Sequence, residues 1–169
     1  MKGVLDGNPL AGAEAETLQP NSNNVIVVRI SPGSNNTKDL TLAGIILHEG
    51  MHAQLYRIIA SNNNVKYNIN NADYQWLLQL NEWWKNQSKI FPEINAQHDF
   101  MSVKYVHPIA KAIRSFDSNN YSLNNYMYFG WDGLFDEGKN RGLITKEEFS
   151  YYSILKEIPL NDNHKISCE

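Results

Sequence analysis

Five consecutive residues in the first third of the chain have the types and spacing needed to bind and use a metal ion. They are His48-Glu49-Gly50-Met51-His52, an HExxH motif. Residues four apart lie on one face of a helix, so both imidazoles can reach the same ion. Glu49 is offset by about 100° around the helix, where it can take a proton from a metal-bound water without ligating the metal. The motif therefore predicts hydrolytic chemistry at a metal centre.

The composition limits which other side chains can complete such a centre. The chain has 169 residues, with 5 His, 18 Asp and Glu together, and one cysteine, Cys168. A disulfide framework within the chain and a cysteine-rich zinc or iron–sulfur site are therefore excluded. The net charge of −3 gives no sign of a nucleic-acid partner or an anionic membrane partner. We expect the remaining ligands to be histidines or carboxylates.

The motif lies in a segment with a strongly helical and apolar pattern. We expect a helix from about residue 37 to residue 60, and residues 40–60 carry apolar side chains on nearly every side, which is typical of a buried helix. Burying two histidines and a glutamate there is costly unless they have partners. A bound metal ion would be such a partner.

A catalytic zinc usually has three protein ligands and a water, so one ligand must come from elsewhere in the chain. The best candidate is His98, on a helix expected from residue 92 or 93 to residue 116, with Pro108 kinking or interrupting it. His98 shares a helical face with Met101, which places it toward the core. Asp99 is the alternative third ligand, or an orienting partner for a ligand histidine. A carboxylate elsewhere, such as Glu82 or Glu93, also stays open.

At the HEGMH residues the sequence resembles the zincin class of zinc metallopeptidases. The resemblance implies that His48 and His52 bind Zn²⁺ and that Glu49 is the catalytic base. The metzincin branch is excluded, because it requires Gly and His where this chain has Leu55 and Ile58. The expected function is zinc-dependent hydrolysis of peptide bonds, with an endopeptidase the expected type. The alternative is a zinc-binding interaction domain without catalysis.

The remaining pattern predicts an α+β fold, mostly helical, with a small sheet packed near the HExxH helix. Residues 1–24 are expected to be a loosely structured lead-in, and residues 25–169 a single metallopeptidase domain. The β-branched run Val25–Ile30 predicts a strand. The zincin resemblance implies an edge strand that pairs with substrate, and Val25–Ile30 is either that strand or an ordinary member of the sheet. Further helices are expected over 72–85, in part of 121–134, and from Thr145 to about Glu157.

Zincins often stabilise the developing oxyanion with a Tyr or His, and the candidates here are His107, Tyr121, Tyr126 and Tyr128. The four tryptophans are expected to belong to the core.

The chain shows no signal peptide and no apolar run long enough to span a membrane. It is therefore expected to be cytoplasmic, or a delivered domain of a longer protein. Its build resembles the C-terminal toxin or effector domains of larger secreted bacterial proteins. That resemblance implies a cognate inhibitor protein as a partner, besides the peptide or protein substrate.

Overall fold

Two helices and a small sheet position the predicted site. The structure, a computed structural model, describes residues 2–6, 14–18, 23, 25–31, 38–61 and 93–162. It divides into two compact units: the first unit comprises 1–35 and 49–100, and the second comprises 36–48 and 101–169. The division passes through helices α1 (Asp39–Ser61) and α3 (Glu93–Lys104). The expected α+β class, mostly helical with one small sheet, is confirmed. The single domain over 25–169 stays a prediction.

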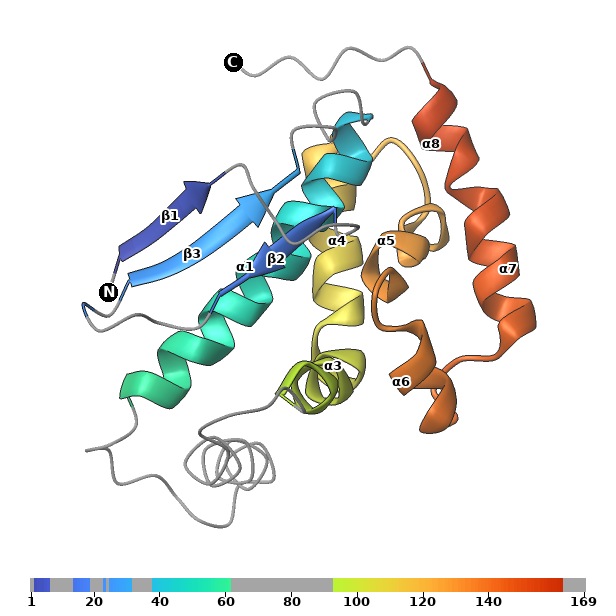
Figure 1. Ribbon diagram of the computed structural model, residues 1–169. Helices are drawn as coiled ribbons and strands as arrows, with labels where there is room; N and C mark the ends of the chain where they lie inside the picture. Colours follow the sequence, from blue (N-terminus) through green and yellow to red (C-terminus); the bar gives the residue numbers. More distant parts are fainter. Residues whose placement is uncertain are drawn as a thin grey trace. The chain divides into compact units, whose positions relative to one another are not determined.

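The sheet of the first unit has three strands in the order β1-β3-β2 (Figure 1). The predicted strand is confirmed as β3 (Val25–Ile30), which lies in the middle. β1 (Lys2–Asp6) pairs parallel to it, with Lys2 opposite Val25, and β2 (Ala15–Thr17) pairs antiparallel, with Ala15 opposite Ile30.

This sheet corrects one expectation and decides between two alternatives that the sequence left open. The lead-in over 1–24 is not loosely structured throughout, because β1 and β2 form there. Both are short and lack the β-branched run that marks β3, so their own residues do not predict a strand. They form strands by pairing with β3. β3 is also not an edge strand, because β1 and β2 flank it on both sides. It is therefore an ordinary strand of the sheet, and its role in pairing with substrate is ruled out.

Besides the first part of α1, the second unit consists mainly of short helices that follow α3. They are α4 (Val106–Phe116), the 3-10 helix η3 (Leu123–Asn125), α5 (Met127–Trp131), α6 (Phe135–Asn140), α7 (Lys146–Leu155) and α8 (Glu157–Asn161). α4 packs against α5, and α5 packs against α7. α4 contributes Ile109, Ala110 and Ile113 to the core, while α5 contributes Phe129 and Trp131. The partly helical character expected for 121–134 and the core position expected for Trp131 are both confirmed.

The predicted interruption of a helix by Pro108 is confirmed. The helix predicted from residue 93 to 116 is interrupted at Tyr105, three residues before the proline. Pro108 lies in the first turn of α4, where its missing N–H leaves no helical hydrogen bond unmade. An unbroken helix would require that N–H to bond to the carbonyl of Lys104, so the break falls where the proline demands it.

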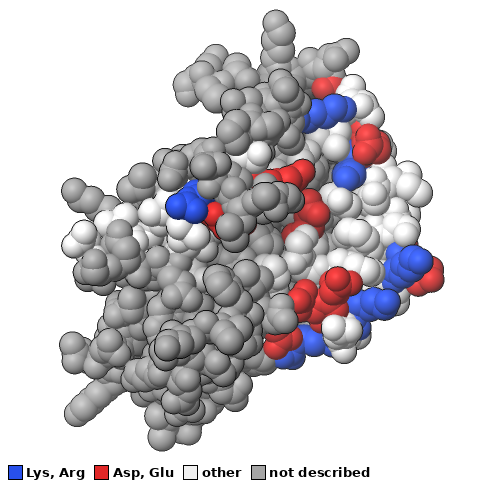
Figure 2. All heavy atoms as spheres, in the orientation of Figure 1, with Lys and Arg blue, Asp and Glu red and all other residues white. Residues whose placement is uncertain are grey.

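The described surface in Figure 2 carries charges of both signs among uncharged residues. Figure 2 shows Lys and Arg side chains interspersed with Asp and Glu side chains on the described part of that face, in agreement with the small net charge of −3. Among the helices in the described ranges, none is long and apolar enough to cross a bilayer. The helix expected over 72–85, with Trp76, Trp83 and Trp84, lies outside the described residues.

The N-terminus of α7 is stabilised by a capping box. The predicted capping box is confirmed: the Glu148 backbone N–H donates to Thr145 Oγ1 at 3.1 Å, and the Thr145 backbone N–H donates to Glu148 Oε2 at 2.8 Å. We expect Thr145→Ala to lower the free energy of unfolding by about 1 kcal/mol, because it leaves the Glu148 backbone N–H without its acceptor. Thr145→Ser keeps the hydroxyl and should stay near wild type. Urea unfolding of the three proteins measures both, and equal loss in the two variants would contradict the cap.

Candidate metal centre

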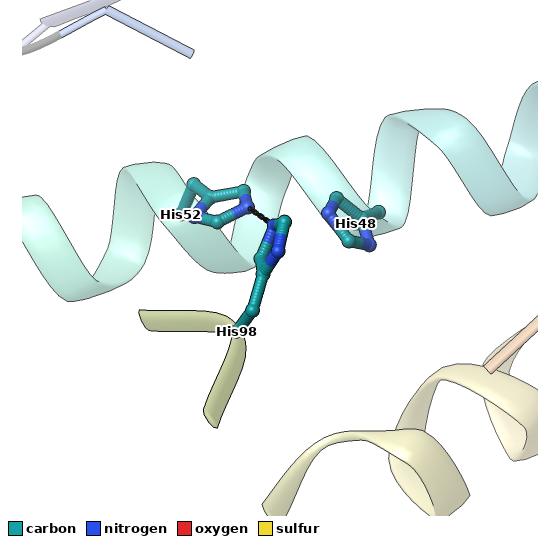
Figure 3. A group of neighbouring side chains, drawn as sticks. All are labelled: His48, His52 and His98. Carbon is teal, nitrogen blue, oxygen red and sulfur yellow. Dashed lines mark hydrogen bonds between the residues drawn. The ribbon is translucent and has the colours of Figure 1, made fainter. Parts of the chain in front are cut away.

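Three histidines from two helices come together in the structure. His48 and His52 lie one turn apart on α1, and His98 approaches the same side of that helix from α3 (Figure 3). One ring nitrogen from each of the three lies within 4.8 Å of the others. The Nε2 atoms of His52 and His98 are 3.0 Å apart, and their ring planes are tilted by 48°. The structure thus brings together the three residues that the sequence singled out as ligands.

The face of α1 that carries the motif is the buried one. His52 and Leu55 are buried, and Glu49 is only 8% exposed. The opposite side is not buried, since Ile46 and Gly50 are exposed. The prediction that α1 is buried on nearly every side is therefore wrong for this side. Apolar side chains such as Ile46 made the helix pattern look more buried than the fold makes it.

Burial keeps two of the histidines in the form that binds metals. Desolvation lowers the pKa of His52 to about 4, with the neighbouring His98 adding to the effect and the hydrogen bond with Gln97 opposing it. Desolvation also lowers the pKa of His98 to about 4. Both imidazoles are therefore neutral at pH 7, and only a neutral imidazole has a lone pair to offer a metal ion.

A second contact holds the His52 ring from its other nitrogen. The side-chain oxygen of Gln97, Oε1, lies 2.6 Å from His52 Nδ1, and Gln97 is 1% exposed. Gln97 immediately precedes His98 on α3. Histidines that bind metals usually donate their second ring N–H to an acceptor of this kind. No sequence signal singled out Gln97, because glutamines are usually exposed.

The Glu49 carboxylate is anchored by the edge strand of the sheet. The hydroxyl of Thr17, on β2, lies 2.6 Å from Glu49 Oε2 and 3.0 Å from the Glu49 backbone oxygen, and can donate to either. Burial raises the pKa of the Glu49 carboxyl; the Thr17 hydrogen bond opposes this, and the negative charge of Glu16 adds to it. A raised carboxyl pKa is the usual property of a glutamate that must both accept and release a proton. Thr17 lies in the segment expected to be a loose lead-in, so the sequence alone does not predict its contact with Glu49.

A glycine of the second unit lies against His48. Gly133 has a backbone φ of +76°, and a Cβ added there would meet His48 Cε1 at 2.9 Å. The left-handed conformation and the imidazole therefore both favour glycine at this position. Gly133 thus limits the positions that the His48 ring can occupy.

Substituting this glycine tests that contact. Gly133→Ala should destabilise the protein by roughly 1–2 kcal/mol through the left-handed backbone, and should also weaken the binding of a metal ion at the three histidines by displacing His48. The matched control is Gly142→Ala, since Gly142 has a φ of +69° but open space around its Cβ position. Urea unfolding should show similar losses of stability in both variants. Zinc affinity should fall only in Gly133→Ala, and equal affinities would contradict the role of the contact.

Three histidine nitrogens form a donor set that suits a divalent transition metal, zinc among them. Four-coordinate zinc with Zn–N bonds of about 2.0–2.1 Å separates its nitrogen ligands by about 3.3 Å, close to the 3.0 Å between His52 and His98. Three imidazoles also suit several other divalent transition metals, so the arrangement defines a metal site more firmly than it defines zinc. Asp99 is half-buried and is not among the residues brought together here. Glu82 lies outside the described residues, as does the side chain of Glu93.

The four residues expected to stabilise an oxyanion lie in the second unit, and the three tyrosines among them contact other side chains there. Tyr126 is buried, and its hydroxyl donates to Asp117. Tyr121 donates to Asp162. Tyr128 stacks on Phe149, and His107 is exposed on α4. The oxyanion role stays a prediction for each of them.

Comparison with known proteins adds no relative. No protein family matches the chain, and neither a curated protein nor a solved structure matches it. The function of the site must therefore be inferred from the three clustered histidines, Glu49 and their partners.

Proposed function

We propose that this protein is a zinc-dependent peptidase of zincin type, in which His48, His52 and His98 hold the metal and Glu49 is the general base. One observation carries the proposal. Ring nitrogens of all three histidines lie within 4.8 Å of one another, and Glu49, on the same helix as two of them, is buried with its pKa raised. Metal-assisted hydrolysis requires at least a set of metal ligands and a general base beside them.

Each residue then has a defined task. A bound zinc ion would polarise the substrate carbonyl and lower the pKa of a water molecule. Glu49 takes the proton from the attacking water and delivers it to the leaving amine nitrogen. Thr17 keeps the carboxylate from rotating freely, because its hydroxyl lies within hydrogen-bonding distance of one carboxylate oxygen and leaves the other available for the water. The expected substrate is a peptide or a protein.

A specific observation also favours the alternative, a zinc-binding domain without catalysis. The 2.6 Å contact between Thr17 and Glu49 Oε2 is short and occupies half of the carboxylate. That hydrogen bond opposes the rise in the Glu49 pKa, so if it persists when substrate is present it makes the carboxylate a weaker base. The same metal site would then serve binding alone.

Two measurements on the purified protein separate these functions. Metal analysis should find one zinc per chain, and a screen of peptide libraries should find cleavage that stops on treatment with a chelator and returns with zinc. One zinc per chain without cleavage of any peptide would favour the binding domain. Cleavage that is unchanged in metal-free protein would contradict the proposal. A delivered-domain origin and a cognate inhibitor protein stay predictions.

A further inference from the structure

We propose that Gln97 fixes the tautomer of His52 and thereby positions its Nε2 atom for the metal. The Gln97 side chain is almost fully buried, at 1% exposed, and its Oε1 atom lies 2.6 Å from His52 Nδ1. A buried amide is costly unless its polar atoms are used. Because Oε1 contacts an imidazole beside the metal site, the role of Gln97 goes beyond packing.

The chemistry of the two groups determines where the proton lies. An amide oxygen can only accept a hydrogen bond, so His52 must carry its proton on Nδ1. In a neutral imidazole the other nitrogen, Nε2, then holds the lone pair. That nitrogen is the one that lies 3.0 Å from His98 Nε2. The lone pair of His52 therefore faces the third ligand rather than the helix interior.

Neighbouring positions on α3 supply both partners of the His52 ring. Gln97 meets Nδ1, and His98 meets Nε2. The His52 ring is thus held at both nitrogens by one dipeptide, which sets its rotation as well as its tautomer. Gln97 is a positioning residue in this arrangement, because it acts on the metal only through His52. The inference rests on the metal-binding part of the proposed function and does not require peptide hydrolysis.

The tautomer can be read directly in metal-free wild-type protein. Two-bond nitrogen–proton NMR correlations of ¹⁵N-labelled histidine distinguish a ring protonated on Nδ1 from one protonated on Nε2. We expect His52 to be protonated on Nδ1. Protonation on Nε2 would mean that the amide nitrogen of Gln97 faces the ring, which would overturn the inference whether or not the protein is a peptidase.

Two variants test the effect on metal binding. Gln97→Met has similar length but no acceptor, and we expect it to weaken zinc affinity about 10- to 100-fold, the usual effect of losing such a partner. Gln97→Glu keeps an acceptor and should bind zinc at least as tightly as wild type. Competition with a chromophoric chelator measures both affinities. Wild-type affinity in Gln97→Met, or an equal loss in Gln97→Glu, would overturn the inference.

Failure of this inference and failure of the proposed function give different results. A wild-type protein that binds no zinc at all contradicts the metal site itself. A wild-type protein that binds zinc but cleaves no peptide contradicts only the peptidase. In that second case the order of zinc affinities among wild type, Gln97→Met and Gln97→Glu still decides the role of Gln97.

Discussion

Replacing Glu49 with glutamine is expected to abolish peptide hydrolysis while zinc remains bound. The amide has almost the same shape as the carboxylate and can still accept a hydrogen bond from Thr17, which lies 2.6 Å from the Glu49 carboxylate. It cannot accept the proton of the attacking water. General bases contribute typically 10²- to 10⁴-fold to a rate, so kcat should fall by at least about 100-fold. Cleavage of a fluorogenic peptide and zinc content, measured on the same preparation, provide the two readouts.

The matched control is Glu147→Gln on α7, because Glu147 is exposed and the chemical change is the same. Its cleavage rate should equal that of wild type. Glu49→Gln should also fold at least as stably as wild type, since the substitution removes a carboxyl that burial keeps difficult to ionise. A Glu49→Gln protein that cleaves peptide at the wild-type rate would contradict the assigned mechanism, and with it the role of Glu49 as base.

Replacing His52 with alanine is expected to remove most of the zinc affinity. His52 is 7% exposed, and both of its ring nitrogens have partners, Gln97 and His98. Losing a direct ligand should cost more than the roughly 10- to 100-fold caused by losing an outer partner. We therefore expect zinc affinity to fall by more than about 100-fold, as measured by competition with a chelator.

His107→Ala provides the comparison for His52→Ala. His107 is exposed on α4 and is not part of the histidine group. The substitution should leave zinc affinity at the wild-type value. Circular dichroism of the metal-free variants distinguishes loss of a ligand from loss of the fold. Equal zinc affinities in the His52 and His107 variants would show that His52 is not a ligand.

Local patterns in the sequence were sufficient to predict the elements whose signals are local. The β-branched residues Val25–Ile30 form β3, and the spacing of Thr145 and Glu148 marks the start of α7. His48 and His52 share a helix face because α1 is continuous between them. In each case the signal depends on residues within one or two turns of the chain, where periodicity and capping apply directly.

Residues whose roles depend on distant pairing could not be predicted in this way. Thr17 reaches Glu49 only because β2 pairs with β3, and three residues of mixed type give no strand signal of their own. Gln97 looks like an ordinary polar helix residue until His52 is placed beside it. Gly133 becomes informative only when the space that His48 occupies is known.

His98 lies between these two cases. Its helical spacing from Met101 indicated a core-facing position, and Met101 is indeed fully buried. The same reasoning could not separate His98 from Asp99, because consecutive helix positions differ by only about 100° around the axis. The distance from His52 is the observation that separates them.

An anomalous-scattering map recorded at the zinc absorption edge would show directly which side chains hold the metal. Crystals of the protein grown with zinc should show one strong peak, at bonding distance from His48, His52 and His98 and not from Asp99. A peak bonded to Asp99 in place of His98, or a map with no peak near His48 and His52, would contradict the three-histidine centre on which the proposed function rests.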